Sequence, residues 1–119
     1  MVEIIKLNDE SEDETFINKL NYESYFDKSL FFDLLKGIVE QGLSEMNTKQ
    51  KDNNLSIIFN IYSYTTVCII SHFNKNDLYK IKNYTDDIIT YLEIFREIIK
   101  LFINDDKLLN KYTDYLNEL

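Results

Sequence analysis

The chain has 119 residues, a length typical of one domain, and 45% of them are hydrophobic, which excludes an intrinsically disordered chain. Its 21 acidic residues outnumber 13 basic ones, and the resulting net charge of −8 argues against nucleic acid and against anionic membrane surfaces as ligands. Cys68 is the sole cysteine, so no disulfide can form within the chain.

The composition also indicates a source and a compartment. Alanine and proline are missing and glycine occurs twice, whereas Asn, Lys, Ile and Tyr are abundant. Because Ala, Pro and Gly have GC-rich codons, this bias indicates an AT-rich genome such as that of a parasite, a low-GC bacterium or a virus. No basic segment followed by an apolar run opens the sequence, so we expect no secretory signal and an intracellular location, which would be the host cytoplasm for a viral protein.

The N-terminal segment, residues 1–11, is expected to be an arm or an edge strand because its residues Val2 to Leu7 are rich in β-branched side chains. Five carboxylates follow in residues 9–14. Ser11 and Glu14 have the spacing of a capping box, which predicts a helix start, with an acidic interaction tail as the alternative. The apolar side of that short helix is Phe16, Ile17 and Leu20.

A second helix is predicted from Lys28 to Met46, with Asp27 or Ser29 as its N-cap. Gly37 and Gly42 lie inside it, and each glycine costs about 1 kcal/mol of helix stability relative to alanine. We therefore expect something to pack closely against both glycines.

Residues 48–54 are expected to form a polar loop, and residues 55–73 form the most apolar part of the chain. Residues 55–73 contain no Asp, Glu, Lys or Arg, and their pattern favours a buried central helix. Alternating apolar residues from Leu55 to Ile61 leave a β-hairpin as the alternative. Its seven Ser, Thr, Asn and His residues make it too polar for a predicted membrane span.

The clearest helix follows a short helical turn predicted at residues 78–82, and Thr85 is its expected N-cap. Two neighbouring apolar stripes make it a helix that touches more than one neighbour. The first stripe is Ile88, Leu92, Phe95, Ile99 and Phe102, and the second is Tyr91, Ile94, Ile98 and Leu101. Asp105 or Asp106 is expected to begin a last helix, with Leu108, Tyr112, Tyr115 and Leu119 facing inward.

Catalytic and metal-binding patterns are missing from the sequence. His72 is the sole histidine, and the two glycines cannot form a phosphate-binding loop. A Cys68–His72 pair at helical spacing could imitate a thiol-protease dyad, but a structural histidine fits the apolar surroundings better. The aspartate pairs at 86–87 and 105–106 precede apolar segments, where helix caps belong. We therefore expect no enzymatic activity, no metal and no cofactor.

Residues 25–62 resemble the dimerisation-and-docking helical hairpin of protein kinase A regulatory subunits and their relatives. Those modules begin with an aromatic-acidic turn, continue with an apolar helix containing a Leu-Leu-x-Gly step, and add a second apolar helix. The corresponding residues are Tyr25, Phe26, Asp27, Leu34, Leu35, Gly37, Ile38, Phe59, Ile61 and Tyr62. The prolines between the helices of such modules are missing here, and the loop is longer. The resemblance implies a helical hairpin that dimerises.

A second resemblance is architectural. A small acidic protein with an apolar central helix wrapped by amphipathic ones is similar to virus-encoded Bcl-like inhibitors of host defence, although the glycine-arginine motif of that family is missing.

These observations predict one all-α domain over residues 1–119, a compact bundle of about five helices, with an α+β fold containing a hairpin at 55–73 as the alternative. The expected function is non-enzymatic protein–protein interaction, as a small inhibitor or adaptor. The alternatives are a structural subunit of a larger assembly and a viral Bcl-like inhibitor. The expected partner is another protein, including a second copy of the chain, with no nucleic acid and no membrane insertion. Surplus apolar residues on two helices predict the docking surface. They are Phe31, Leu34, Ile38, Tyr91, Ile94 and Ile98.

Overall fold

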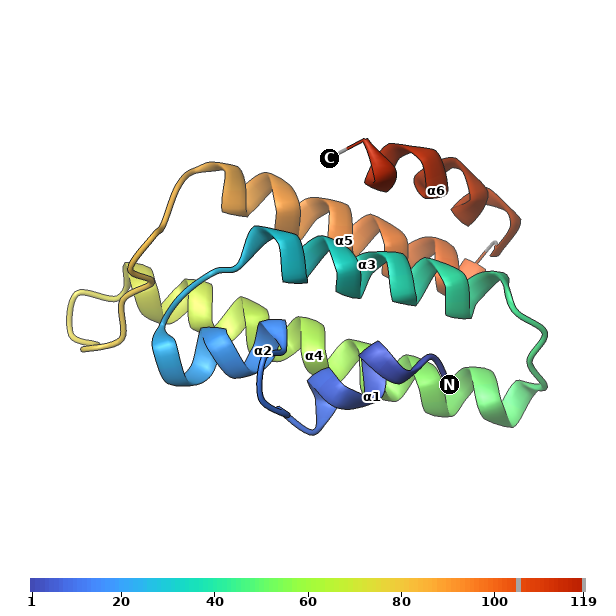
Figure 1. Ribbon diagram of the computed structural model, residues 1–119, viewed down its shortest axis with the longest axis horizontal. Helices are drawn as coiled ribbons and strands as arrows, with labels where there is room; N and C mark the ends of the chain where they lie inside the picture. The colour runs from blue at the N-terminus through green and yellow to red at the C-terminus, as the bar shows by residue number, and fades with distance from the viewer. Residues whose placement is uncertain (105, 119) are drawn as a thin grey trace.

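The fold is built entirely from helices in the part of the chain that the structure describes, residues 1–104 and 106–118 of a computed structural model (Figure 1). The helical content is 74%, with six α-helices and no strand in these residues. In chain order the elements are α1 (Glu3–Asp9), α2 (Phe16–Asn18), a π-helical turn (Lys19–Glu23), α3 (Lys28–Leu43), α4 (Thr48–Phe73), α5 (Asp87–Asn104), a 3-10 turn (Asp106–Leu109) and α6 (Asn110–Asn117). The predicted all-α bundle is therefore confirmed, and the alternative hairpin at residues 55–73 is wrong.

Helix α3 is the centre of the bundle. It lies against α1 and α2 on one side and against α5 and α6 on the other (Figure 1). The side chains of Phe31, Leu34, Leu35 and Ile38 are completely buried. The N-cap at Asp27 was predicted correctly, since its carboxylate accepts a hydrogen bond from the backbone N–H of Leu30 (3.0 Å).

Helix α4 is longer and more peripheral than predicted. Asn47 and Gln50 form a capping box, in which each side chain accepts a hydrogen bond from the other residue's backbone N–H (2.8 and 3.0 Å). The expected polar loop at residues 48–54 is therefore the start of this helix. The prediction that 55–73 is helical is confirmed, but its predicted place at the buried centre is wrong because one side of α4 faces solvent.

The N-terminal segment is a helix, and the predicted arm or edge strand is wrong. Ile5 is buried, and the Asn8 amide joins α1 to α2 by donating to the Ile4 carbonyl (2.9 Å) and accepting from the Ile17 N–H (3.0 Å). The predicted capping box is also wrong, because Ser11 and Glu14 both have positive φ angles within a turn. Thr15 caps the next helix instead, accepting a hydrogen bond from the Asn18 N–H (3.2 Å).

Both glycines of α3 face close neighbours, as expected. A Cβ atom at Gly37 would overlap the Cγ2 methyl of Ile4 in α1. A Cβ atom at Gly42 would overlap Leu109 and would come within 2.9 Å of the Phe102 ring. The glycines therefore serve packing within the chain.

The C-terminal register differs from the prediction. Leu109 and Leu116 are buried, whereas Leu108 and Tyr115, which were expected to face inward, are exposed. Asp105 and Leu119 lie outside the described residues. The short helical turn predicted at residues 78–82 is also wrong, since that segment is a non-helical loop that the Tyr79 hydroxyl ties to the Leu20 carbonyl (2.6 Å).

Candidate functional site

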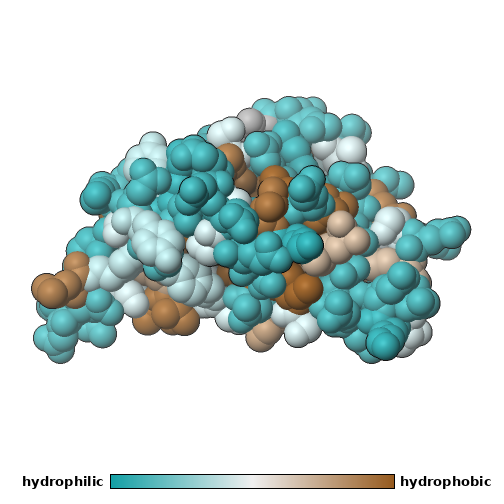
Figure 2. Space-filling model, turned by 60° about the horizontal axis from the view of Figure 1, so that its bottom comes forward, coloured by the Kyte–Doolittle hydropathy of each residue, from teal (hydrophilic) through white to brown (hydrophobic). Residues whose placement is uncertain are grey.

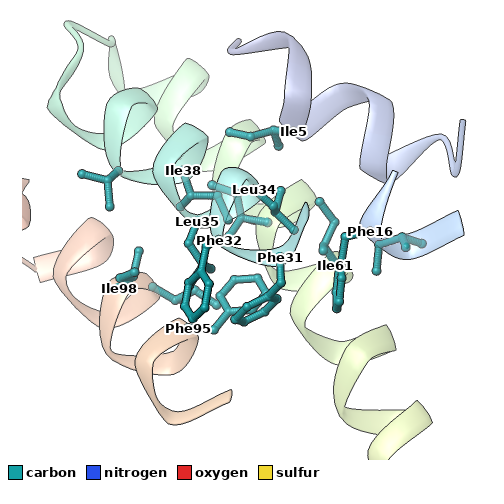
Figure 3. Close-up of a cluster of buried hydrophobic side chains, with 14 of the residues drawn as sticks. Ile5, Phe16, Phe31, Phe32, Leu34, Leu35, Ile38, Ile61, Phe95 and Ile98 are labelled. Atoms are coloured by element: carbon teal, nitrogen blue, oxygen red, sulfur yellow. The ribbon is translucent and has the colours of Figure 1, made fainter. Parts of the chain in front are cut away.

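The predicted docking surface lies mostly inside the protein. Phe31, Leu34, Ile38 and Ile98 are completely buried, and Figure 3 shows them pointing into the cluster between the helices. Tyr91 and Ile94 are half-buried, and the Tyr91 ring packs edge-on against Phe32 at 5.0 Å between ring centroids. The prediction that these six residues form an accessible docking surface is therefore corrected. The short helices α1 and α2 cover the side of α3 that was expected to be free.

The residues that carry the two resemblances are packed differently from what the resemblances imply. The Leu-Leu-x-Gly step at residues 34–37 is packed within one chain rather than offered to a second copy. The central helix is α3, whereas the resemblance to Bcl-like inhibitors places residues 55–73 there.

Among the helices that the structure describes, α4 carries the most exposed large apolar side chains. Phe59, Val67, Ile70 and Phe73 have exposed fractions of 59%, 56%, 62% and 59%. At 100° per residue these four side chains fall within an arc of about 120° on one side of the helix. We call them the α4 outer face. The opposite side of α4 holds the buried residues Asn54, Ile58, Ile61, Thr65, Cys68 and Ile69.

The α4 outer face is free of charge along its whole length. No Asp, Glu, Lys or Arg occurs from Asn53 to Asn74, although charged residues make up 29% of the chain. A helix side that faces only water normally carries charged side chains. The same uncharged run is visible in the sequence, where it predicts a buried helix, because apolar composition alone does not tell which side of a helix is covered.

An acidic turn lies beside the first half of this face. The Asn60 amide donates to the Asp9 carboxylate (3.5 Å), and Asp9 and Phe59 line the same surface hollow of about 360 Å³. Of the five carboxylates in residues 9–14, Glu14 pairs with Lys19 (3.9 Å). No ion pair joins the other four to a described residue. This side of the α4 outer face is therefore strongly negative.

The loop after α4 carries an exposed apolar side chain and three lysines. Leu78 is 99% exposed in this loop. Figure 2 shows hydrophobic atoms at the corresponding tip of the molecule, among hydrophilic ones. The loop, residues 74–86, contains Lys75, Lys80 and Lys82 against two aspartates, Asp77 and Asp86. The Lys80 ammonium donates to the carbonyl of Asn74 (3.0 Å), which places this positive charge directly at the end of α4.

Cys68 is buried, and His72 is hydrogen-bonded to the loop after α4. Burial raises the pKa of the Cys68 thiol above its ordinary value, although hydrogen bonds with Tyr79 and Tyr64 act in the opposite direction. A thiol held in its protonated form is a poor nucleophile. The Nδ1 atom of His72 accepts a hydrogen bond from the Ile81 N–H (2.9 Å), and its ring stacks on Tyr84. This histidine holds the loop after α4 in place.

A second apolar surface, a groove of about 320 Å³, lies between α3 and α6. Val39, Leu43 and Leu116 provide its apolar lining, and Lys36 and Glu40 stand at its edge. The described residues contain no group of three or more His, Cys, Asp or Glu side chains placed to hold a metal ion.

Length and composition alone would allow α4 to cross a membrane, a property that core helices of soluble proteins share.

No protein-family model matches the chain, and comparison with curated proteins and with solved structures found no match.

Proposed function

We propose that this chain is a non-enzymatic protein–protein interaction module whose docking surface is the α4 outer face. The observation that carries the proposal is the exposure of Phe59, Val67, Ile70 and Phe73 on a helix side without a single charge. Exposed apolar surface of this kind costs solvation free energy and typically marks an interaction site. A protein partner would remove these side chains from water.

Two further observations support a protein as the ligand. The buried side of α4 supplies Ile58, Ile61 and Ile69 to the same core as α3 and α5, so the helix is needed to complete the soluble fold. The polar residues Ser63 and Thr66 interrupt the apolar face, as is common where two protein surfaces meet.

The buried Cys68, which forms no disulfide, fits the reducing, intracellular location that we propose for the chain.

The test introduces one charge on the face. In Ile70→Glu a carboxylate replaces an apolar side chain that is 62% exposed, so the fold should be retained while docking is lost. Ile103→Glu is the matched control, because Ile103 is 51% exposed on a different helix, α5. Proteins captured from the source or host cell by the immobilised wild-type chain should be lost with Ile70→Glu and retained with Ile103→Glu.

Two results would contradict the proposal. Equal capture by wild type and Ile70→Glu would show that the face does not dock a protein. Flotation of the wild-type chain with lipid vesicles, abolished by Ile70→Glu, would show that the face binds lipid instead.

A further inference from the structure

The α4 outer face has an internal symmetry in its sequence. Phe59 and Phe73 each lie seven residues from Thr66, one on either side. Seven residues make about two helical turns, so both rings lie on the same side of α4 as Thr66, each about 10.5 Å from it along the axis. Two copies of α4 packed antiparallel with Thr66 at their crossing point would place each Phe59 against Phe73 of the other copy.

The middle of the face is shaped for such a crossing. Ser63, Thr66 and Val67 are smaller than the phenylalanines at the two ends. Small side chains at the crossing point let two helices approach within about 8 Å of each other, while the rings at the ends fill the widening space. Ser63 and Thr66 are half-buried, whereas Phe59 and Phe73 at the two ends are both 59% exposed.

The charges around the face select the direction of the pairing. The acidic turn at residues 9–14 carries five carboxylates and lies beside Phe59, whereas the loop at residues 74–86 carries three lysines and two aspartates beyond Phe73. A parallel pair would bring two acidic turns together. An antiparallel pair places the acidic turn of each copy near the lysine-bearing loop of the other, which is electrostatically favourable.

We propose that the occupant of the α4 outer face is a second copy of this chain, in an antiparallel two-fold dimer with Thr66 on the axis. This inference rests on the proposed function, because it assigns a partner to the same surface. The interface is isologous, so each copy contributes the same residues and each pair of contacts occurs twice. It brings two chains of net charge −8 together along a helix side where neither copy carries charge.

The pairing is tested by cysteine cross-linking under mild oxidation. Thr66→Cys should form a disulfide with itself across the axis, because the two Cα atoms come within the roughly 7 Å that a disulfide requires. An equal mixture of Phe59→Cys and Phe73→Cys should give the mixed disulfide in excess over either homodimer. Wild type, in which Cys68 is buried, and Ser29→Cys, at an exposed site on α3, are controls that should stay monomeric on a non-reducing gel.

Sedimentation of the unmodified chain provides the second measurement. Over about 1 µM to 1 mM, the range of weak association, the wild-type chain should show a monomer–dimer equilibrium. Ile70→Glu should weaken it at least tenfold, and Ile103→Glu should leave it unchanged. Homodimeric disulfides of Phe59→Cys and Phe73→Cys in excess over the mixed one would overturn the antiparallel arrangement, and a monomer at every concentration would overturn the dimer.

The two proposals fail separately. A monomeric chain whose captured protein is lost with Ile70→Glu keeps the proposed function and refutes the homodimer. A chain for which Ile70→Glu changes neither sedimentation nor capture refutes both.

Discussion

Ile4 of α1 packs against Gly37 of α3 so closely that a Cβ atom at position 37 would overlap the Ile4 Cγ2 methyl group. Alanine in place of glycine inside a helix normally stabilises a protein by about 1 kcal/mol. Overpacking a close contact costs about 1–3 kcal/mol. We therefore expect Gly37→Ala to lower the free energy of unfolding by up to about 2 kcal/mol in urea titrations, against the direction that helix propensity predicts.

A double-mutant cycle isolates this contact. Ile4→Ala removes the methyl group that meets position 37, so Gly37→Ala in the Ile4→Ala background should be neutral or stabilising. Additive effects of the two substitutions would show that α1 does not pack on Gly37.

The loop after α4 depends on one side-chain acceptor. The Nδ1 atom of His72 accepts a hydrogen bond from the Ile81 N–H (2.9 Å), and Ile81 is buried. His72→Phe keeps a ring for Tyr84 to stack on but leaves this N–H without its partner, a loss of about 1–3 kcal/mol. We expect faster amide hydrogen exchange at Ile81 in this variant, measured by NMR.

His72→Asn is the control for that experiment, since its amide oxygen can accept in place of Nδ1. It should restore part of the protection at Ile81. Wild-type exchange rates at Ile81 in His72→Phe would show that the loop is held by other contacts.

The sequence predicted α3 and α5 well because long helices with a wide apolar arc have a strong periodic signal. Phe95 and Ile99, for example, were expected to be inward and are buried. Helix α1 has seven residues, too few for such a signal, and its helical state depends on contacts with α3 and with Ile17 that no local pattern reveals.

The outer side of α4 could not be predicted because apolar residues surround this helix on nearly all sides. Ile61 and Ile70 are equally hydrophobic, yet Ile61 is buried and Ile70 is exposed.

The wrong prediction of the inward-facing residues at the C-terminus has a local cause. The 3-10 turn Asp106–Leu109 advances about 120° per residue instead of 100°, which turns Leu109 inward in place of Leu108.

Two tyrosines near Cys68 should make the protein less stable at alkaline pH. Burial, as the largest cause, raises the pKa of both Tyr64 and Tyr79 above the ordinary value near 10. These phenols stay neutral in the folded chain at a pH where they ionise in the unfolded chain. Their contribution to stability is therefore complete below about pH 10 and is lost as the pH rises above it.

Phenolate absorbance during an alkaline titration measures this directly. Tyr64 and Tyr79 should ionise at a higher pH in the folded chain than in the chain unfolded in urea. In Tyr79→Phe the titration should lose one late phenol. Ionisation of Tyr64 and Tyr79 at the same pH in the folded and the unfolded chain would contradict the prediction.

A buried and an exposed position of the bundle should respond differently to an inserted charge. Leu34 in α3 is completely buried, whereas Ile70 in α4 is 62% exposed. A carboxylate at position 34 would lie without a partner among apolar side chains, which costs several kcal/mol out of a total stability of about 5–15 kcal/mol. Leu34→Glu should therefore be unfolded or should melt far below wild type by circular dichroism, while Ile70→Glu should melt within a few degrees of it.

Leu34→Ala separates the effect of charge from the effect of a cavity. It should fold, with a loss of about 2–5 kcal/mol. A folded Leu34→Glu together with an unfolded Ile70→Glu would mean that α3 faces solvent and α4 fills the core. In that case the docking surface would belong to Phe31, Leu34 and Ile38, and the α4 outer face would be part of the core.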